Sequence, residues 1–260
     1  MLTYPDIKPY IISIGPLQIR WYSMMYLIGF VSSYLLVKYQ IRKKNLSIDG
    51  KIIEDIYFYI VLGLILGARL GYVLIYNLSE YLRNPLEILA VWHGGMSFHG
   101  GLVGALIAGI VIARKRHLNY WLYSDLIIVT APIGLGLGRI GNFINSELYG
   151  RVTDVPWAMV FPGGGDLPRH PSQLYEAFFE GLILFILLWF GKDRIMVKGR
   201  ITALFLILYG FMRFSMEFFR EPDYQLGFIV SILTMGQILS IIMIIAGVVI
   251  LYRQKSACNG

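Results

Sequence analysis

Long apolar runs with few charges constrain this chain more than any other feature of its sequence. Each run approaches or exceeds the roughly 20 residues that a helix needs to cross a bilayer. Because backbone polar groups in lipid must be satisfied within the segment, such runs fold as helices. We therefore expect an all-α integral membrane protein with seven transmembrane helices, at residues 21–37, 56–76, 96–113, 118–138, 174–190, 201–219 and 226–252.

The composition indicates that lipid is the main solvent. Hydrophobic residues make up 57% of the 260 residues and charged residues 15%, whereas soluble domains carry about 25% charged residues. No internal repeat is visible, so we expect a single transmembrane domain over residues 1–260. Its longest external connection is expected at 139–171, where Gly and Pro break the helix pattern and predict a small outward-facing loop region.

Basic residues gather in alternate loops, which is the pattern of cytoplasmic loops. The N-terminus is therefore expected outside and the C-terminus inside. The net charge of +7 does not call for nucleic acid as a partner, because an anionic inner leaflet attracts the same excess. The basic residues that follow the first, third, fifth and seventh runs are Lys38, Arg42, Lys43, Lys44 and Lys51; Arg114, Lys115 and Arg116; Lys192, Arg194, Lys198 and Arg200; and Arg253 and Lys255.

The stretch GLGLGRIGNFINSELYG at 134–150 begins as an apolar run and then turns polar. Gly136, Gly138 and Gly141 fit the G-x-G-x-x-G pattern of dinucleotide sites, but that pattern requires a preceding strand and a βαβ unit. Here the glycines end a membrane run, so we interpret them as places where a helix or a lipid headgroup approaches the backbone. Small residues at helical spacing also predict packing seams at Gly63, Gly67 and Gly71 and at Gly100 and Gly104.

Arg139 lies in this stretch, and a guanidinium beside hydrocarbon is costly unless it is paired or reaches the interface. Two interpretations are open. Arg139 forms an ion pair with Glu147 that holds the loop, or its planar fork clamps a phosphate group. Arg213 favours the second interpretation, since it lies deep in another apolar run and two arginines that converge from different spans would form an anion site.

His99 follows a glycine-rich segment at the start of the third run. Histidine exchanges protons near neutral pH, although a hydrogen-bonded structural histidine is the commoner case. His93 lies six residues earlier, so the two do not share a helix face and no metal pair is expected. The H-G-G pattern is similar to a lipase oxyanion loop, but the sequence has no G-x-S-x-G motif, which disfavours a serine lipase. Cys258 is the only cysteine, so thiol chemistry would need a thiol from elsewhere.

Other polar side chains within the runs have structural as well as functional interpretations. Glu176, Glu180 and Glu217 could carry protons, but pairing with Arg139, Arg169 or Arg213 is the commoner fate of carboxylates in membranes. Tyrosines such as Tyr22 and Tyr209 are interface aromatics or polar partners in a cavity.

Arg69 stands alone within the second run. It could be a third member of an anion site. We favour a structural role for it instead, with Glu54 or Asp55 as its partner.

Several long motifs, in order along the chain, closely resemble the bacterial prolipoprotein diacylglyceryl transferase family. The likeness runs from SIGPLQIRWY near the N-terminus to the last apolar run. Several motifs in the right order are far more specific than any one of them. They are WHGGMSFHGGLVG at 92–104, GRIGNFINSELYGR at 138–151, RHPSQLYEA at 169–177, YGFMRFSMEFFREPDYQLG at 209–227 and TMGQILS at 234–240.

The resemblance implies a multi-pass enzyme of the bacterial cytoplasmic (inner) membrane, with seven spans, its N-terminus outside and its active site toward the outer leaflet. Such an enzyme transfers the sn-1,2-diacylglyceryl group from phosphatidylglycerol to the thiol of the lipobox cysteine of prolipoproteins. A thioether forms and sn-glycerol 1-phosphate leaves, in the first step of lipoprotein maturation. The expected partners are phosphatidylglycerol, prolipoprotein signal peptides and membrane lipids, with no cofactor and no metal.

Motif positions also imply roles for individual residues. Arg139 corresponds to the family's phosphatidylglycerol-binding arginine and Arg213 to its second essential arginine. His99 corresponds to the histidine that is often proposed as the base, while Glu147 is a second candidate base or orients Arg139. The further positions that match the family's functional set are Tyr22, Asn142, Gly150 and Tyr209.

The outer loop departs from the family pattern. Only the five residues 163–167 separate Pro162 from Pro168, where better-known members carry a longer insertion, so we expect a reduced external head. Two functions of other classes remain as alternatives. A secondary transporter would use the same charges to carry an anion, and a structural scaffold would bind phosphatidylglycerol without turnover.

Overall fold

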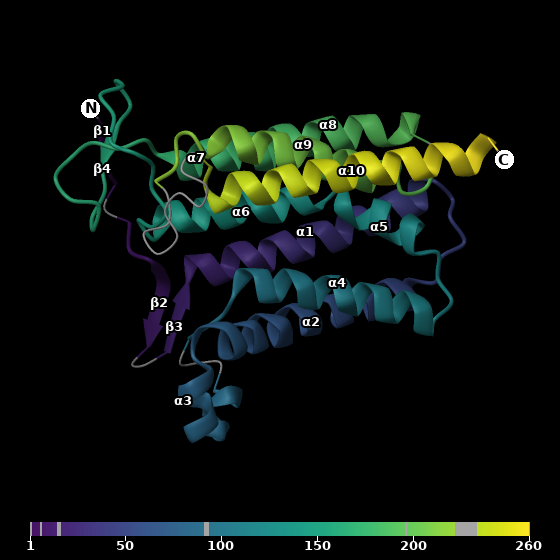
Figure 1. Cartoon of the computed structure of the whole chain (residues 1–260), viewed down its shortest axis with the longest axis horizontal. Helices are drawn as coiled ribbons and strands as arrows, with labels where there is room; N and C mark the ends of the chain where they lie inside the picture. The colour runs from purple at the N-terminus through teal and green to yellow at the C-terminus, as the bar shows by residue number, and fades with distance from the viewer. Residues whose placement is uncertain are drawn as a thin grey trace. The chain divides into compact units, whose positions relative to one another are not determined.

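The computed structural model describes residues 2–5, 7–14, 17–90, 94–195, 197–221 and 233–259. Helices dominate it, as Figure 1 shows. Contacts divide the chain into two compact units, one formed by Met1–Gln40 with Ser124–Gly260 and the other by Ile41–Tyr123.

Within the described ranges, five helical segments are long and apolar enough to cross a membrane. A sixth is counted if the bent pair α5 (Tyr120–Ile128) and α6 (Ala131–Ile144) forms one span. The chain is thus a mostly helical, multi-pass membrane protein. The five segments are α1 (Trp21–Lys43), α2 (Gly50–Tyr76), α4 (Phe98–Lys115), Ser172–Arg194 and α10 (Met235–Asn259).

The expected count of seven spans depends on α9 (Arg200–Met216), which has 17 residues. That length is the lower limit of the roughly 17–25 residues seen in spanning helices. Part of the seventh expected run, 226–252, lies outside the described residues, and α10 covers the rest. Seven spans therefore remain a prediction.

The fourth expected run, 118–138, is not one straight helix. Its two helices meet at a 42° bend, and α6 has Pro132 in its first turn. Proline has no N–H to continue the preceding helix and suits the start of a new one. Helix α6 also extends to Ile144, so Arg139 and Asn142 are helical and the connection expected from 139 begins at Asn145.

Short strands accompany the helices. Strands β2 (Tyr10–Ile14) and β3 (Leu17–Arg20) form an antiparallel hairpin just before α1, and β1 (Leu2–Thr3) pairs in parallel with β4 (Met159–Val160). The sequence analysis did not predict them, because pairs this short depend on contacts between distant segments. They lie outside the helical spans.

In unit 2, α2 and α4 pack closely together, and α3 (Leu78–Arg83) and η1 (Pro85–Leu89) follow α2. A β-carbon on Gly71 would lie 2.8 Å from the Cα of Gly100, and Gly63 and Gly67 contact Gly104 in the same way. The predicted seam between these glycines is confirmed.

Arg69 has a structural role, but not with the predicted partners. Its guanidinium donates to the backbone carbonyls of Ile88 at 2.9 Å and Ala90 at 3.1 Å, and also to those of Glu87, Gly94 and Gly95. Asp55 instead forms an ion pair with Arg116 at 2.5 Å. The partner predicted for Arg69 is wrong. The backbone carbonyls of η1 and of the residues after it lie closer to Arg69 than the acidic residues of its own helix do.

In unit 1, α6, α8 (Leu184–Gly191), α9 and α10 lie side by side (Figure 1). Their apolar core contains Val129, Leu184, Leu188, Ile201 and Phe205. A short helix α7 (Ser172–Glu176) and a π-helix η3 (Ala177–Ile183) precede α8, and η4 (Lys192–Arg194) follows it.

Two contacts fix the helices that carry the polar residues of unit 1. Gly136 on α6 meets Gly181 on η3 so closely that a β-carbon on Gly136 would lie 2.9 Å from the Cα of Gly181. At the start of α9, the Asp125 carboxylate accepts from the backbone N–H of Gly199 at 2.6 Å and of Thr202 at 2.8 Å. These contacts set α6 against η3 and anchor α9 to α5.

Candidate active site

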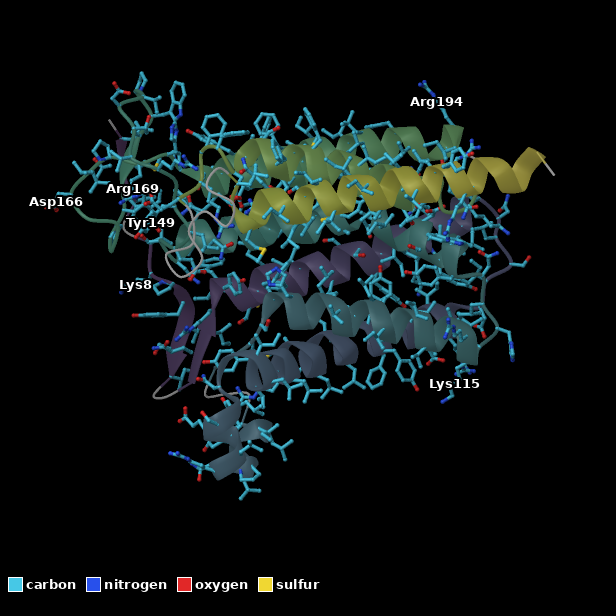
Figure 2. All side chains as sticks on the ribbon, viewed as in Figure 1. Lys8, Lys115, Tyr149, Asp166, Arg169 and Arg194 are labelled. Atoms are coloured by element: carbon cyan, nitrogen blue, oxygen red, sulfur yellow. The ribbon has the colours of Figure 1, made fainter. Side chains whose placement is uncertain are left out.

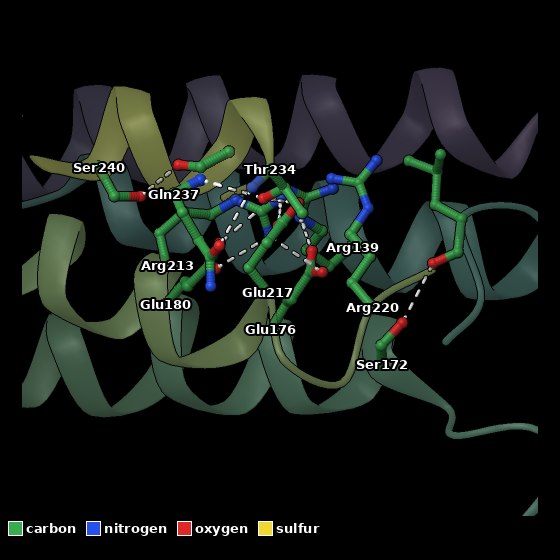
Figure 3. A network of polar contacts seen from close by, with 12 residues as sticks. Arg139, Ser172, Glu176, Glu180, Arg213, Glu217, Arg220, Thr234, Gln237 and Ser240 are labelled. Carbon is green, nitrogen blue, oxygen red and sulfur yellow. Dashed lines mark hydrogen bonds and ion pairs between the residues drawn. The ribbon is translucent and has the colours of Figure 1, made fainter. Parts of the chain in front are cut away.

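Five ionisable side chains of unit 1 meet in one cluster, shown in Figure 3. Arg139 comes from α6, Glu176 ends α7, Glu180 lies on η3, and Arg213 and Glu217 come from the end of α9. We call these five residues the ion-pair cluster. The convergence of Arg139 and Arg213 from different helices agrees with the sequence prediction.

Glu176 links the two arginines. Its Oε2 lies 2.6 Å from Nε of Arg139 and its Oε1 lies 3.1 Å from Nη1 of Arg213. Arg213 also pairs through Nη2 with Oε2 of Glu217 at 2.6 Å, one helical turn later. Glu180 is more distant, with Oε1 3.6 Å from Nη1 of Arg213 and Oε2 4.0 Å from Nη2 of Arg139.

The cluster is buried, but unevenly. The Glu176 and Glu180 side chains are 1% and 0% exposed, whereas 20% of the Arg139 side chain is exposed. Buried charges persist only when they are paired, and here carboxylates supply the pairing. Since Arg139 is the more open arginine, its guanidinium is the better placed of the two to meet a ligand.

A capping box at the start of α10 supports Glu217. The Thr234 hydroxyl accepts from the backbone N–H of Gln237 at 3.3 Å, and the Gln237 side chain accepts from the backbone N–H of Thr234 at 3.1 Å. The same hydroxyl donates to Oε1 of Glu217 at 3.0 Å. Sequence reasoning recognised T-M-G-Q only as a family motif, although the T-x-x-Q spacing is itself a helix-start signal.

The lack of a side chain at Gly236 leaves space for the Glu217 carboxylate. A β-carbon at this position would lie 2.7 Å from the carboxyl carbon of Glu217. The carboxylate therefore rests against the first turn of α10, where the positive end of the helix dipole favours an anion.

A second polar group follows α6. Oε1 of Glu147 accepts from the side-chain amides of Asn142 at 2.8 Å and Asn145 at 3.2 Å. The backbone carbonyl of Glu147 accepts from Gln173 at 2.7 Å. Among the described residues, the ion pairs of Arg139 go to Glu176 and Glu180, so the alternative in which Arg139 pairs with Glu147 is wrong. Helix α6 continues past Arg139 to Ile144, so Glu147 lies beyond the helix end. There its carboxylate accepts hydrogen bonds from Asn142 and Asn145.

Tyr22, Gly150 and Tyr209 also belong to unit 1. The Tyr22 ring contacts Gly141, and its hydroxyl lies 3.1 Å from that of Tyr26. Gly150 donates its backbone N–H to the carbonyl of His170 at 2.8 Å, and a side chain there would collide with neighbouring backbone. Tyr209 lies one turn before Arg213 on α9.

The glycines of the G-x-G-x-x-G match are helical packing positions, as expected. All three lie inside α6 rather than in a turn between a strand and a helix. Gly136 faces Gly181, Gly138 approaches the Tyr26 hydroxyl and Gly141 contacts Tyr22.

Of the predicted catalytic residues, His99 lies outside unit 1. It lies in the first turn of α4 in unit 2, after Ser97, which caps the helix by accepting from the backbone N–H of Gly100 at 3.3 Å. The His99 ring lies 5.7 Å from that of Phe98. His93 lies outside the described residues.

The loop region at 145–171, called the head below, is small and well connected. Figure 2 places Tyr149, Asp166 and Arg169 together, at the end of unit 1 opposite Arg194. Arg169 pairs with Glu221 at 2.7 Å, donates to the carbonyl of Gly164 at 2.9 Å and lies over the Tyr149 ring.

His170 joins the head to the helices. Its Nδ1 lies 3.1 Å from the Tyr175 hydroxyl, which also accepts from Trp157 at 2.6 Å, and its ring packs against Phe219. Burial lowers the pKa of His170 from its usual value of 6.5. The imidazole is therefore neutral at neutral pH.

Comparisons with known proteins agree with this arrangement. The family model described as prolipoprotein diacylglyceryl transferase matches residues 9–253. A protein from Desulfotalea psychrophila named phosphatidylglycerol–prolipoprotein diacylglyceryl transferase is 52% identical over 251 residues, which are 94% of this chain and 92% of that protein. A protein of the same name from Geobacter sulfurreducens is 48% identical over 98% of this chain and 99% of its own length. Another, from Bordetella bronchiseptica, is 53% identical over 95% of each chain.

The match covers the ion-pair cluster and the whole loop region at 145–171. On the combined evidence of the motifs, the fold and these relatives, the chain belongs to the prolipoprotein diacylglyceryl transferase family.

Proposed function

We propose that this chain transfers the sn-1,2-diacylglyceryl group of phosphatidylglycerol to the cysteine thiol of prolipoprotein lipoboxes. The reaction forms a thioether, releases sn-glycerol 1-phosphate and begins lipoprotein maturation. The relatives' names and near-complete coverage support the activity. The structural observation that carries it is the meeting of Arg139 and Arg213 in one ion-pair cluster within an apolar helical unit.

We assign the phosphate group of phosphatidylglycerol to the two arginines. Arg139 binds it first, because it is the more exposed of the pair. Arg213 holds the far side of the cluster, and Glu176 fixes the spacing of the two guanidinium groups by contacting both. A planar guanidinium donates two parallel hydrogen bonds to phosphate oxygens, which gives this site orientation as well as charge.

In the proposed reaction, the sulfur attacks the glyceryl carbon that bears the phosphate. The C–O bond to the phosphate breaks, a C–S bond forms, and negative charge grows on the departing phosphate monoester. Fixed cations aimed at that charge lower the barrier. The thiol has a free pKa of about 8.5, and its proton passes to a base. His99 and Glu147 are the two candidates, and the nucleophile comes from the substrate.

The remaining assignments concern the surroundings of the reacting groups. Tyr22, Asn142, Gly150 and Tyr209 are proposed to shape the substrate site. Asn142 does so through Glu147, to which it donates a hydrogen bond. Gly150 does so by letting the backbone beyond α6 run close to that of the His170 segment.

We further propose seven spans, with α9 as the sixth, in the bacterial cytoplasmic membrane. The N-terminus lies outside, the C-terminus lies in the cytoplasm and the active site faces the outer leaflet. The alternation of basic loops supports this orientation. The whole chain then acts as one enzyme domain, with 145–171 as its outward-facing head.

The test is direct transfer. Purified protein is incubated in vesicles with phosphatidylglycerol and a lipobox peptide, and the mass of the peptide is then measured by mass spectrometry. The expected result is a diacylglyceryl mass increase on the cysteine, which a matched peptide with serine in place of cysteine does not show. An anion carrier would move solute across sealed vesicles without changing the peptide, and a lipid scaffold would bind phosphatidylglycerol without product.

A further inference from the structure

The ion-pair cluster contains five ionisable groups, which cannot all be paired one to one. Among the five residues of the cluster, two guanidinium groups face three carboxyl groups, so full ionisation of these five leaves one negative charge in excess. A buried net charge is costly, and an anionic phosphate group that enters beside it is repelled. The excess disappears if one of the three carboxyl groups keeps a proton.

Glu176 and Glu217 are both well stabilised as anions. Glu176 lies 2.6 Å from Arg139 and 3.1 Å from Arg213. Glu217 lies 2.6 Å from Arg213, accepts from the Thr234 hydroxyl at 3.0 Å and rests at the start of α10. Close charged donors and a helix N-terminus favour the ionised form of a carboxyl group.

Glu180 has none of these supports. Its nearest guanidinium nitrogens are 3.6 and 4.0 Å away, beyond ordinary hydrogen-bond distance. Across the described part of the chain, neither of its carboxyl oxygens takes part in a hydrogen bond, and the residue is 0% exposed. Of the three carboxyl groups, Glu180 therefore gains least from being charged.

The surroundings of Glu180 come from three elements. Arg139 approaches from α6, Arg213 from α9, and Glu176 precedes Glu180 by one turn. Tyr209 also lies on α9, Glu217 caps its C-terminal end, and Arg220, drawn in Figure 3, follows three residues later. Glu180 itself lies on the π-helix η3, a form of helix that is rare and often marks functional sites. Since both cations here are already paired closely with other carboxylates, they do not require Glu180 as a counter-ion.

We propose that Glu180 is a protonated carboxylic acid in the resting enzyme, and that its lack of charge keeps the cluster neutral so that Arg139 and Arg213 can receive an anionic phosphate group. The identity of that phosphate rests on the proposed function. Glu180 acts through the arginines and is a positioning residue. Its proton stays in place during transfer, and the thiol proton goes to the base described above.

Infrared difference spectroscopy of the purified protein tests the proton directly. The wild-type protein is expected to show the carbonyl band of a protonated carboxylic acid at neutral pH. Glu180→Gln removes this band, and the control variant Glu221→Gln, whose carboxylate pairs with Arg169 outside the cluster, retains it. If Glu180→Gln leaves the acid band unchanged, or if wild-type protein has no such band, the proposal is wrong.

Transfer kinetics give the second readout, with Glu176→Gln as the control on the neighbouring turn. An amide is the closest neutral substitute for a carboxylic acid, so Glu180→Gln is expected to raise KM for phosphatidylglycerol and to lower kcat less than Glu176→Gln does. Glu176→Gln is expected to raise KM and lower kcat, because it removes the anion that both arginines share. If Glu180→Gln loses folding or transfer to the same extent as Glu176→Gln, the proposal is contradicted.

The two tests also separate this inference from the proposed function. If wild-type protein modifies no lipobox peptide, the transfer function fails while the infrared result still reports on the Glu180 proton. If wild-type protein is active and Glu180→Gln is not, the function stands and the inference fails.

Discussion

Gly136 and Gly181 bring two helices into backbone contact beside the ion-pair cluster. A β-carbon on Gly136 would lie 2.9 Å from the Cα of Gly181, and one on Gly181 would lie 2.7 Å from the Cα of Gly136. Arg139 follows Gly136 by one turn, and Glu180 directly precedes Gly181. The close approach of these glycines thus sets the distance between the arginine of α6 and the carboxylates of α7 and η3.

Gly136→Ala is expected to push α6 away from η3 and weaken both stability and transfer. Overpacking of this kind costs about 1–3 kcal/mol, and it separates Arg139 from Glu176. Thermal unfolding and the peptide transfer assay measure the two effects. Gly134→Ala is the matched control, because a β-carbon there meets nothing within 4 Å. Equal behaviour of the two variants would show that helix contact does not position Arg139.

Thr234→Val is expected to loosen Glu217 and to lower transfer. It removes both the capping acceptor at the start of α10 and the donor to Glu217, and the loss of a helix cap costs about 1 kcal/mol. Thr234→Ser, which keeps the hydroxyl, should behave like the wild-type protein in unfolding and transfer assays. A Ser variant as impaired as the Val variant would show that loss of the hydroxyl does not explain the effect.

The choice between His99 and Glu147 as the base is open to a kinetic test. If His99 accepts the thiol proton, His99→Gln lowers kcat/KM by roughly 10²- to 10⁴-fold and removes the histidine limb from the pH–rate profile. Glu147→Gln then retains that limb. If His99→Gln keeps both the rate and its pH dependence, histidine is not the base and Glu147 becomes the candidate.

His170 predicts an acid sensitivity of the head. Burial lowers the pKa of His170 in the folded protein below its usual value of 6.5, so the unfolded chain binds the proton more readily. The resulting stability is present above pH 6.5 and is lost as the pH falls through the lowered value. Unfolding measured from neutral to acidic pH should therefore show a smaller acid-dependent loss in His170→Gln than in the wild-type protein. Identical pH profiles would remove His170 as the cause.

Hydropathy and motif order predicted the helical membrane class and the meeting of Arg139 with Arg213. The break between α5 and α6 had a visible signal in Pro132, but the length of the apolar run concealed it. The sequence left the partner of Arg139 open between Glu147 and the carboxylates Glu176 and Glu180. Glu147 is nearer in sequence, whereas Glu176 is brought near by the glycine contact between α6 and η3.

Capping was the most readable signal that the sequence analysis did not use. Thr234 and Gln237 fit a helix-start pattern, and the structure adds that the Thr234 hydroxyl also reaches Glu217. The five carbonyl contacts of Arg69 could not be foreseen, because backbone acceptors carry no residue-specific signal. Interactions within a helix turn were thus predictable, and those between distant segments required the fold.

The role of Arg139 as the phosphate ligand is tested most directly by transfer in Arg139→Ala, measured as the diacylglyceryl mass increase on a lipobox peptide. Arg194→Ala is the control, since Arg194 lies at the end of unit 1 opposite the head (Figure 2). We predict that Arg139→Ala remains membrane-inserted and loses transfer by at least about 100-fold, while Arg194→Ala keeps it. Near-normal transfer by inserted Arg139→Ala would contradict the account.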